Sequence, residues 1–173
     1  MPHKKSVSIT QCGLLTALAM VLSLIERLFP LEAIIPIPGI KLGLANVVTL
    51  FALSSMTIRQ ALLILLCRVI LVSLLMGSIT AFLFSLFGGL LSLLLIYILL
   101  RTASKSCSLL GVSVAGAAAH NVGQVAAAAI WMQTSAVIVY LPPLLVMSVP
   151  LGLVTGLTAS VTLTHLKKIN FHV

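Results

Sequence analysis

The residues of this chain best suited to chemistry are a few polar side chains set within long apolar segments. A carboxylate, an imidazole, a hydroxyl and three carboxamides can hydrogen-bond a small polar molecule. Because such groups are costly inside a membrane, each one is a candidate for function when it faces other helices. We therefore predict substrate binding without catalytic residues. The predicted binding residues are Glu26, Asn46, Thr49, His120, Asn121 and Gln124.

The composition indicates which elements position these side chains. The 173 residues are 61% hydrophobic and only 7% charged, and the mean hydropathy is +1.28. These values predict an integral membrane protein, because soluble domains carry roughly 25% charged residues. A crossing needs about 20 apolar residues, so the chain has room for roughly six helices and for no soluble catalytic domain.

Hydropathy predicts an all-α bundle of six transmembrane helices in one membrane domain, residues 1–173. The second and third helices are short for a full crossing, and the last is long. It contains Pro142, Pro143 and Pro150, which favour a tilt, a kink or an irregular segment before it. The predicted helices are 9–29, 42–55, 61–76, 81–100, 109–132 and 137–164.

The basic residues predict the orientation of the bundle. With six crossings, most of them lie on the side of the two termini, whereas Lys41 lies opposite. The positive-inside rule then places both termini in the cytoplasm, the chain in the plasma membrane and loop 30–41 outside. The residues on the cytoplasmic side are Lys4, Lys5, Arg59, Arg101, Lys105, Lys167 and Lys168.

Counting residues along each helix gives the polar groups a height. Gln124 falls at roughly 24 Å from the cytoplasmic end, and Glu26 and Asn46 lie near that level. This predicts a polar pocket that opens outward. Arg68 lies lower, at roughly 13 Å, so we expect a structural or gating role and no direct salt bridge to Glu26. For His120 or Gln124 alone, interhelical hydrogen bonding worth about 1 kcal/mol is an equally good explanation.

The loop before the second helix is a candidate lid. Pro36, Pro38 and Gly39 predict a stiff extended segment with a turn, and Lys41 ends it. A stiff loop can order over a pocket at low entropic cost. The simpler interpretation is a connecting loop without a function of its own.

Other motifs define or exclude partners. Gly13 and Ala17 form a small-x-x-x-small patch that suits close helix contact, either inside the bundle or with a partner. The net charge of +8 is dispersed, so we predict no nucleic-acid binding. The three cysteines are far apart and predict no metal site. No Walker A motif occurs, so any ATP must be used by partner subunits.

Two stretches resemble a known family. They are Pro36 to Thr49, which reads PIPGIKLGLANVVT, and Ala119 to Gln124, which reads AHNVGQ. They resemble the Gx transporter family, also labelled heptaprenyl diphosphate synthase component I, which is similar to the S components of energy-coupling-factor (ECF) transporters. The resemblance implies the S-component fold, loop 30–41 as the lid, and Gly13 and Ala17 as the contact with a coupling transmembrane subunit.

Two functions remain open at this point, beside the simpler option of a membrane scaffold that binds no ligand. The first is a subunit that captures a small organic molecule, such as a weakly charged cofactor precursor, for uptake energised by partner ATPases. The second is a non-catalytic accessory subunit of a heptaprenyl diphosphate synthase, since Glu26 and Glu32 are too few carboxylates for a catalytic magnesium site. We expect no cofactor bound by the chain itself.

Overall fold

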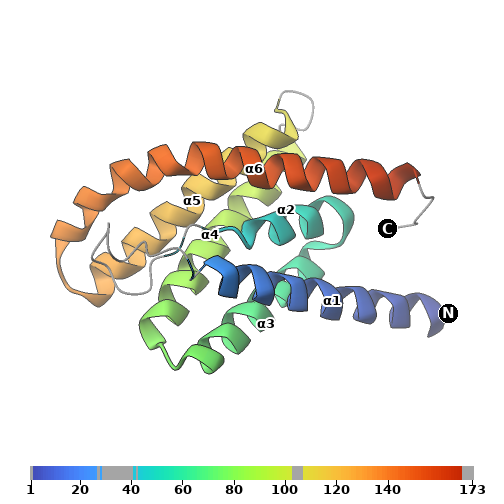
Figure 1. Cartoon of the computed structure of the whole chain (residues 1–173), viewed down its shortest axis with the longest axis horizontal. Coiled ribbons are helices and arrows are strands. Elements are labelled where there is room, and N and C mark those ends of the chain that lie inside the picture. The colour runs from blue at the N-terminus through green and yellow to red at the C-terminus, as the bar shows by residue number, and fades with distance from the viewer. Residues whose placement is uncertain (1, 27, 29–40, 42, 103–106, 169–173) are drawn as a thin grey trace.

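The computed structural model of the chain describes residues 2–26, 28, 41, 43–102 and 107–168, with side chains from residue 9 to residue 165 (Figure 1). Every regular element in this part is a helix, so the predicted all-α membrane fold is confirmed. The α-helices are α1 (Pro2–Glu26), α2 (Asn46–Ser55), α3 (Ile58–Met76), α4 (Ile79–Thr102), α5 (Leu109–Trp131) and α6 (Leu141–Lys168), and a 3₁₀ helix, η2 (Ser135–Tyr140), precedes α6.

Four membrane spans among the described residues are long and apolar enough to cross a bilayer. They lie in α1, α3, α4 and the unit formed by η2 and α6. The α2 helix has only 10 residues, and α5 carries several buried polar side chains. The six predicted helices are therefore present, and four of them have the composition of an ordinary crossing.

Local signals explain where the helices begin and end. Thr57 and Gln60 form a capping box at the start of α3, three residues before the predicted boundary. Ser108 caps α5 by accepting a hydrogen bond from the Gly111 N–H. Gly77 ends α3 in the left-handed conformation, with φ of 61°.

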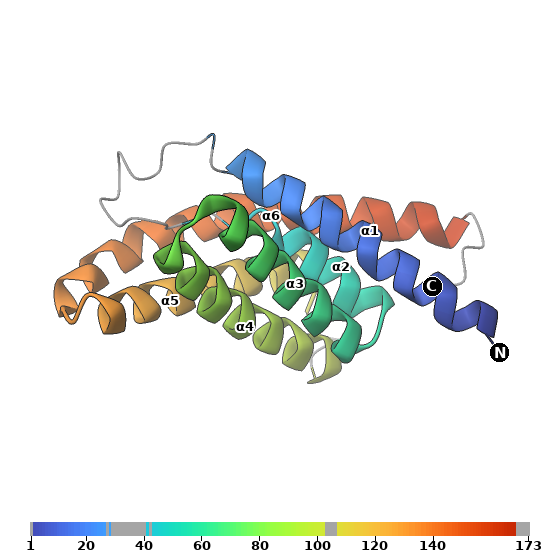
Figure 2. The same cartoon turned by 90° about the horizontal axis from the view of Figure 1, so that it is seen from below.

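The helices pack so that α2 lies between α1 and α6 (Figure 1). The most extensive contacts join α4 to α5 and α5 to α6. Glycines permit these close approaches: a Cβ at Gly123 would lie 2.7 Å from the Phe87 carbonyl oxygen, and one at Gly152 would lie 2.4 Å from the Val114 Cα. The start of α1 and the end of α6 lie at the same end of the molecule (Figure 2).

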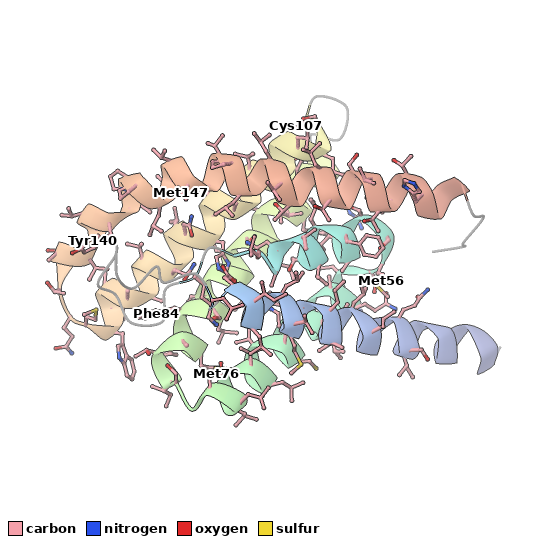
Figure 3. The ribbon with its side chains drawn as sticks, viewed as in Figure 1. Met56, Met76, Phe84, Cys107, Tyr140 and Met147 are labelled. Atoms are coloured by element: carbon pink, nitrogen blue, oxygen red, sulfur yellow. The ribbon has the colours of Figure 1, made fainter. Side chains whose placement is uncertain are left out.

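The proline-rich last segment forms one continuous helix after η2. Pro142 and Pro143 occupy the first turn of α6, where their missing N–H groups cost little. Pro150 lies within the helix. Phe84 on α4, labelled in Figure 3, is 1% exposed and packs with Val125 and Leu144, which joins α4, α5 and α6 in one core.

Candidate ligand-binding site

All six predicted binding residues are buried. Lys41 and Arg68, which flank them, are buried as well, at 8% and 5% exposure. Several of these side chains come together from α1, α2, α3 and α5 and from the chain just before α2. We call the set Glu26, Lys41, Asn46, Arg68, His120 and Gln124 the polar cluster.

The side-chain amide of Gln124 forms hydrogen bonds with both backbone groups of Lys41. Its Nε2 donates to the Lys41 carbonyl oxygen at 2.8 Å, and its Oε1 accepts from the Lys41 N–H at 2.9 Å. This pairing resembles one rung of a β-ladder and satisfies two backbone groups where no regular element does so. The amide predicted to bind a ligand is therefore already engaged within the chain.

Glu26 has a comparable role at the start of α2. Its Oε1 accepts hydrogen bonds from the backbone N–H of Gly43 and, at 3.4 Å, from that of Leu44. A carboxylate at this position complements the positive end of the α2 dipole. Ala45, the N-cap residue of α2, has no side chain that could accept a hydrogen bond. Glu26 on α1 therefore provides the acceptor that an N-cap side chain would normally provide.

The side chains of Asn46 and His120 both lie close to Gly43. Gly43 has φ of 85°, and a Cβ there would lie 2.9 Å from Asn46 Nδ2 and 3.0 Å from His120 Cδ2. Both amide atoms of Asn46 and the Nδ1 of His120 are buried without a hydrogen-bond partner among the described residues. Such groups are rare in native proteins and call for an explanation, and a bound molecule is one.

Arg68 joins the cluster from the middle of α3. Its Nη1 lies 3.5 Å from the Ser23 hydroxyl, and its buried Nη2 has no partner in the described part of the chain. Its charge acts on Glu26, although the height count separated the two groups. The count ignores the crossing of α1 and α3, which run obliquely to each other (Figure 1).

Asn121 and Thr49 lie beside the polar cluster, and Asn121 Oδ1 accepts from Gln124 Nε2 at 3.5 Å. Asn121 Nδ2 donates to the Leu144 carbonyl oxygen at 2.9 Å and to the Ser148 hydroxyl at 3.3 Å, so this side chain ties α5 to α6. Thr49 lies on the buried face of α2. The geometry therefore favours a packing role for Asn121, whereas Asn46 and His120 have buried polar atoms without a hydrogen-bond partner among the described residues.

The predicted lid falls mostly outside the described residues. This applies to Pro36, Pro38 and Gly39. Lys41 is described, and its Nζ donates to the Ser85 hydroxyl at 2.9 Å. Sequence reasoning missed Ser85, although a serine within the apolar α4 was a usable signal.

Two grooves run along α1. One has a volume of about 760 Å³ and lies between α1 and α3, with Gly13 and Ala17 in its lining. Gly13 has open space where a side chain would stand. The other has a volume of about 320 Å³ and lies between α1, α2 and α6, with Leu22, Leu44 and Val47 in its lining. Both predicted docking residues are thus accessible at the surface of the chain.

Within the described residues, no group of three or more histidine, cysteine or acidic side chains is arranged to hold a metal ion. The polar cluster contains hydrogen-bonding groups and charges. It can bind and orient a molecule.

Comparison with known proteins identifies the family. A family model described as heptaprenyl diphosphate synthase component I matches residues 15–162. No curated protein and no solved structure matched the chain. The match extends from α1 to α6 and includes all six residues of the polar cluster. The chain belongs to the heptaprenyl diphosphate synthase component I family.

Proposed function

We propose that this protein is a non-catalytic membrane subunit of a prenyl diphosphate synthase, which binds an isoprenoid ligand and anchors the catalytic partner. The family supports an accessory component that works with a partner synthase component. The observation that carries the binding role is the set of buried, unpartnered atoms of Asn46, His120 and Arg68 among the described residues.

The groove between α1, α2 and α6 supports an isoprenoid ligand in particular. Its lining is aliphatic apart from Phe51 and three threonines. The hydroxyl groups of Thr155, Thr158 and Thr162 donate to carbonyl oxygens of their own helix, so they present methyl groups to the groove. A hydrocarbon chain fits such a surface, and Leu44 at its edge directly follows Gly43 of the polar site.

The carboxylate content argues against catalysis by the chain itself. Elongation of prenyl diphosphates needs magnesium held by several carboxylates. The chain has two acidic residues, and the one that is described, Glu26, is engaged with the backbone before α2. The catalytic step therefore falls to the partner.

Reconstitution with the partner tests this proposal. The full chain in lipid vesicles is added to a soluble prenyltransferase, and the rate and product length are measured. We expect the chain to change one of them, and Asn46→Ala to abolish the change while the partner still binds. Identical rates and product lengths with and without the chain would overturn the proposal.

A second function, capture of a small molecule for ATP-driven uptake, is favoured by the open groove at Gly13 and Ala17. A coupling subunit could pack a helix against this surface. In that case Gly13→Leu should abolish copurification with an ATPase module, and Gly77→Ala, at a glycine remote from the groove, should not. Absence of any ATPase module from crosslinked membranes would exclude this function.

For either function we propose the plasma membrane as the location, with both termini in the cytoplasm. The basic residues near the termini and the common end of α1 and α6 support this orientation (Figure 2). Cysteine labelling from each side of the membrane would test it.

A further inference from the structure

Asn46 and His120 are buried side by side with hydrogen-bonding atoms to spare. They are 4% and 2% exposed, and a Cβ on Gly43 would lie 2.9 Å from Asn46 Nδ2 and 3.0 Å from His120 Cδ2. Neither amide atom of Asn46 nor the Nδ1 of His120 has a partner in the described part of the chain. A buried polar atom without a partner is costly, so these atoms favour a bound polar group.

The second nitrogen of the His120 ring decides what Nδ1 can do. The ring is hydrogen-bonded to the backbone of Gly88, and since Nδ1 has no partner among the described residues, Nε2 makes this bond. Nε2 donates to the Gly88 carbonyl oxygen, because the Gly88 N–H lies inside α4 and is donated along that helix. In a neutral imidazole one nitrogen donates and the other accepts, so Nδ1 is an acceptor.

The surroundings of the ring keep it neutral. The positive charge of Arg68 acts on His120, and both side chains are buried. A second proton on the ring would place two positive charges together in the membrane interior, which is costly. A ligand therefore pairs with Nδ1 only by donating a hydrogen bond to it.

Asn46 adds a donor beside this acceptor. Its Nδ2 carries two N–H groups, and a hydroxyl oxygen can accept from one of them while the hydroxyl proton is donated to His120 Nδ1. One hydroxyl group thus serves both side chains. An ether or ester oxygen only accepts, so it would leave Nδ1 buried and unpaired.

We propose that this site binds the hydroxyl group of an isoprenoid alcohol, which donates to His120 Nδ1 and accepts from Asn46 Nδ2. The hydrocarbon part lies in the groove between α1, α2 and α6, whose lining includes Leu44 and Val47, close to Asn46 in the sequence. The inference rests on the proposed function for this hydrocarbon part. It adds the chemical class of the head group and the residue that selects it.

The experiment uses the purified full chain in detergent and two probes with the same hydrocarbon chain, farnesol and farnesyl methyl ether. Thermal unfolding is followed against the concentration of each probe. We expect the alcohol to give the same stabilisation as the ether at concentrations at least about tenfold lower, because the ether cannot donate to Nδ1.

A matched pair of variants tests the role of Nδ1. His120→Asn and His120→Gln both replace the ring with a carboxamide. In His120→Asn the oxygen is bonded to Cγ, as Nδ1 is, so an acceptor remains in nearly the same place, whereas in His120→Gln it lies one bond further out. We expect His120→Asn to keep an alcohol preference of at least about fivefold and His120→Gln to fall within about twofold. Because the two probes are compared within each variant, their different partitioning into detergent cancels.

Equal responses of the unmodified chain to the two probes would overturn the inference, since water or another part of the chain would then already pair with Nδ1. The isoprenoid ligand of the proposed function would survive that result. A preference that persists in His120→Gln would also overturn the inference. The comparison on the unmodified chain decides even where a variant fails to fold. An alcohol preference without any effect of the chain on a prenyltransferase would support the inference and count against the proposed function.

Discussion

At the scale of single residues, the polar groups of the cluster divide by whether they already have partners. The side chains of Gln124 and Glu26 form hydrogen bonds with the backbone of Lys41, Gly43 and Leu44. Asn46 and His120 keep buried polar atoms without partners among the described residues. The first pair shapes the site, and we propose that the second pair contacts a ligand.

This division predicts different effects for two amide deletions. Gln124→Ala removes two buried hydrogen bonds to the backbone of Lys41 and should cost about 1–3 kcal/mol of unfolding free energy. Asn46→Ala removes an amide that has no partner in the described chain and should leave stability within about 0.5 kcal/mol. Unfolding in detergent measures both. Equal losses of stability would contradict the division.

The sequence was enough to identify the buried polar residues. It did not predict that Gln124 and Glu26 form hydrogen bonds with the backbone before α2. Depth and helical sector brought Glu26, Asn46 and Gln124 to one level, because hydropathy fixes where each helix starts. Whether an amide faces a ligand or a backbone group depends on the path of the chain between α1 and α2, which periodicity does not encode. Ser85 was missed because a single serine in a membrane helix is usually satisfied by its own backbone.

At the scale of elements, the feature that positions the site is the start of α2, where Gly43 leads into Asn46. The helix has 10 residues and begins at Asn46, four residues after the predicted boundary, because Gly43 turns the chain with a positive φ. Glu26 from α1 satisfies the N–H groups exposed by that turn. Glu26 of α1 therefore fixes the start of this short helix, and with it the position of Asn46, the first residue of α2.

Gly43→Ala should disturb this entry and the site together. Backbone strain at positive φ costs about 1 kcal/mol, and the new Cβ would also press on Asn46 and His120. Gly77→Ala is the matched control, because Gly77 also has positive φ but open space around it. We expect equal strain in both variants and loss of ligand binding only in Gly43→Ala. Normal binding by Gly43→Ala would contradict this role.

The contact of α4 with α5 depends on small residues. A Cβ at Gly123 would lie 2.7 Å from the Phe87 carbonyl oxygen and 2.8 Å from the Gly88 Cα, so Gly123→Ala should cost about 1–3 kcal/mol by overpacking. Gly13→Ala meets nothing within 4 Å and should not destabilise the chain. Thermal unfolding of the two variants compares them directly, and equal midpoints would show that this contact is more tolerant than its geometry indicates.

At the scale of the whole molecule, the fold was predictable and its finer arrangement was not. The number and order of the helices follow from hydropathy. The largest boundary error is the start of α1, which begins at Pro2 and not at the predicted residue 9, whereas α2 and α6 each begin four residues late. The oblique crossing of α1 and α3, which brings Arg68 within range of Glu26, depends on side-chain packing between segments distant in the sequence. Such packing has no periodic signal in a single chain.

The same scale supports the proposed binding role in a chain with so few polar residues. The helices enclose one polar cluster, and two apolar grooves lie along α1. We propose that the cluster and the α2 groove bind a ligand and that the Gly13 groove is a surface for a protein partner.

The central claim is that the polar cluster binds a small molecule, and native mass spectrometry of the full chain released from its own membranes tests it most directly. We predict a ligand of defined mass on the unmodified chain, and its loss from Asn46→Ala while that variant remains folded. Equal occupancy of the two proteins, or no bound molecule on either, would contradict the account.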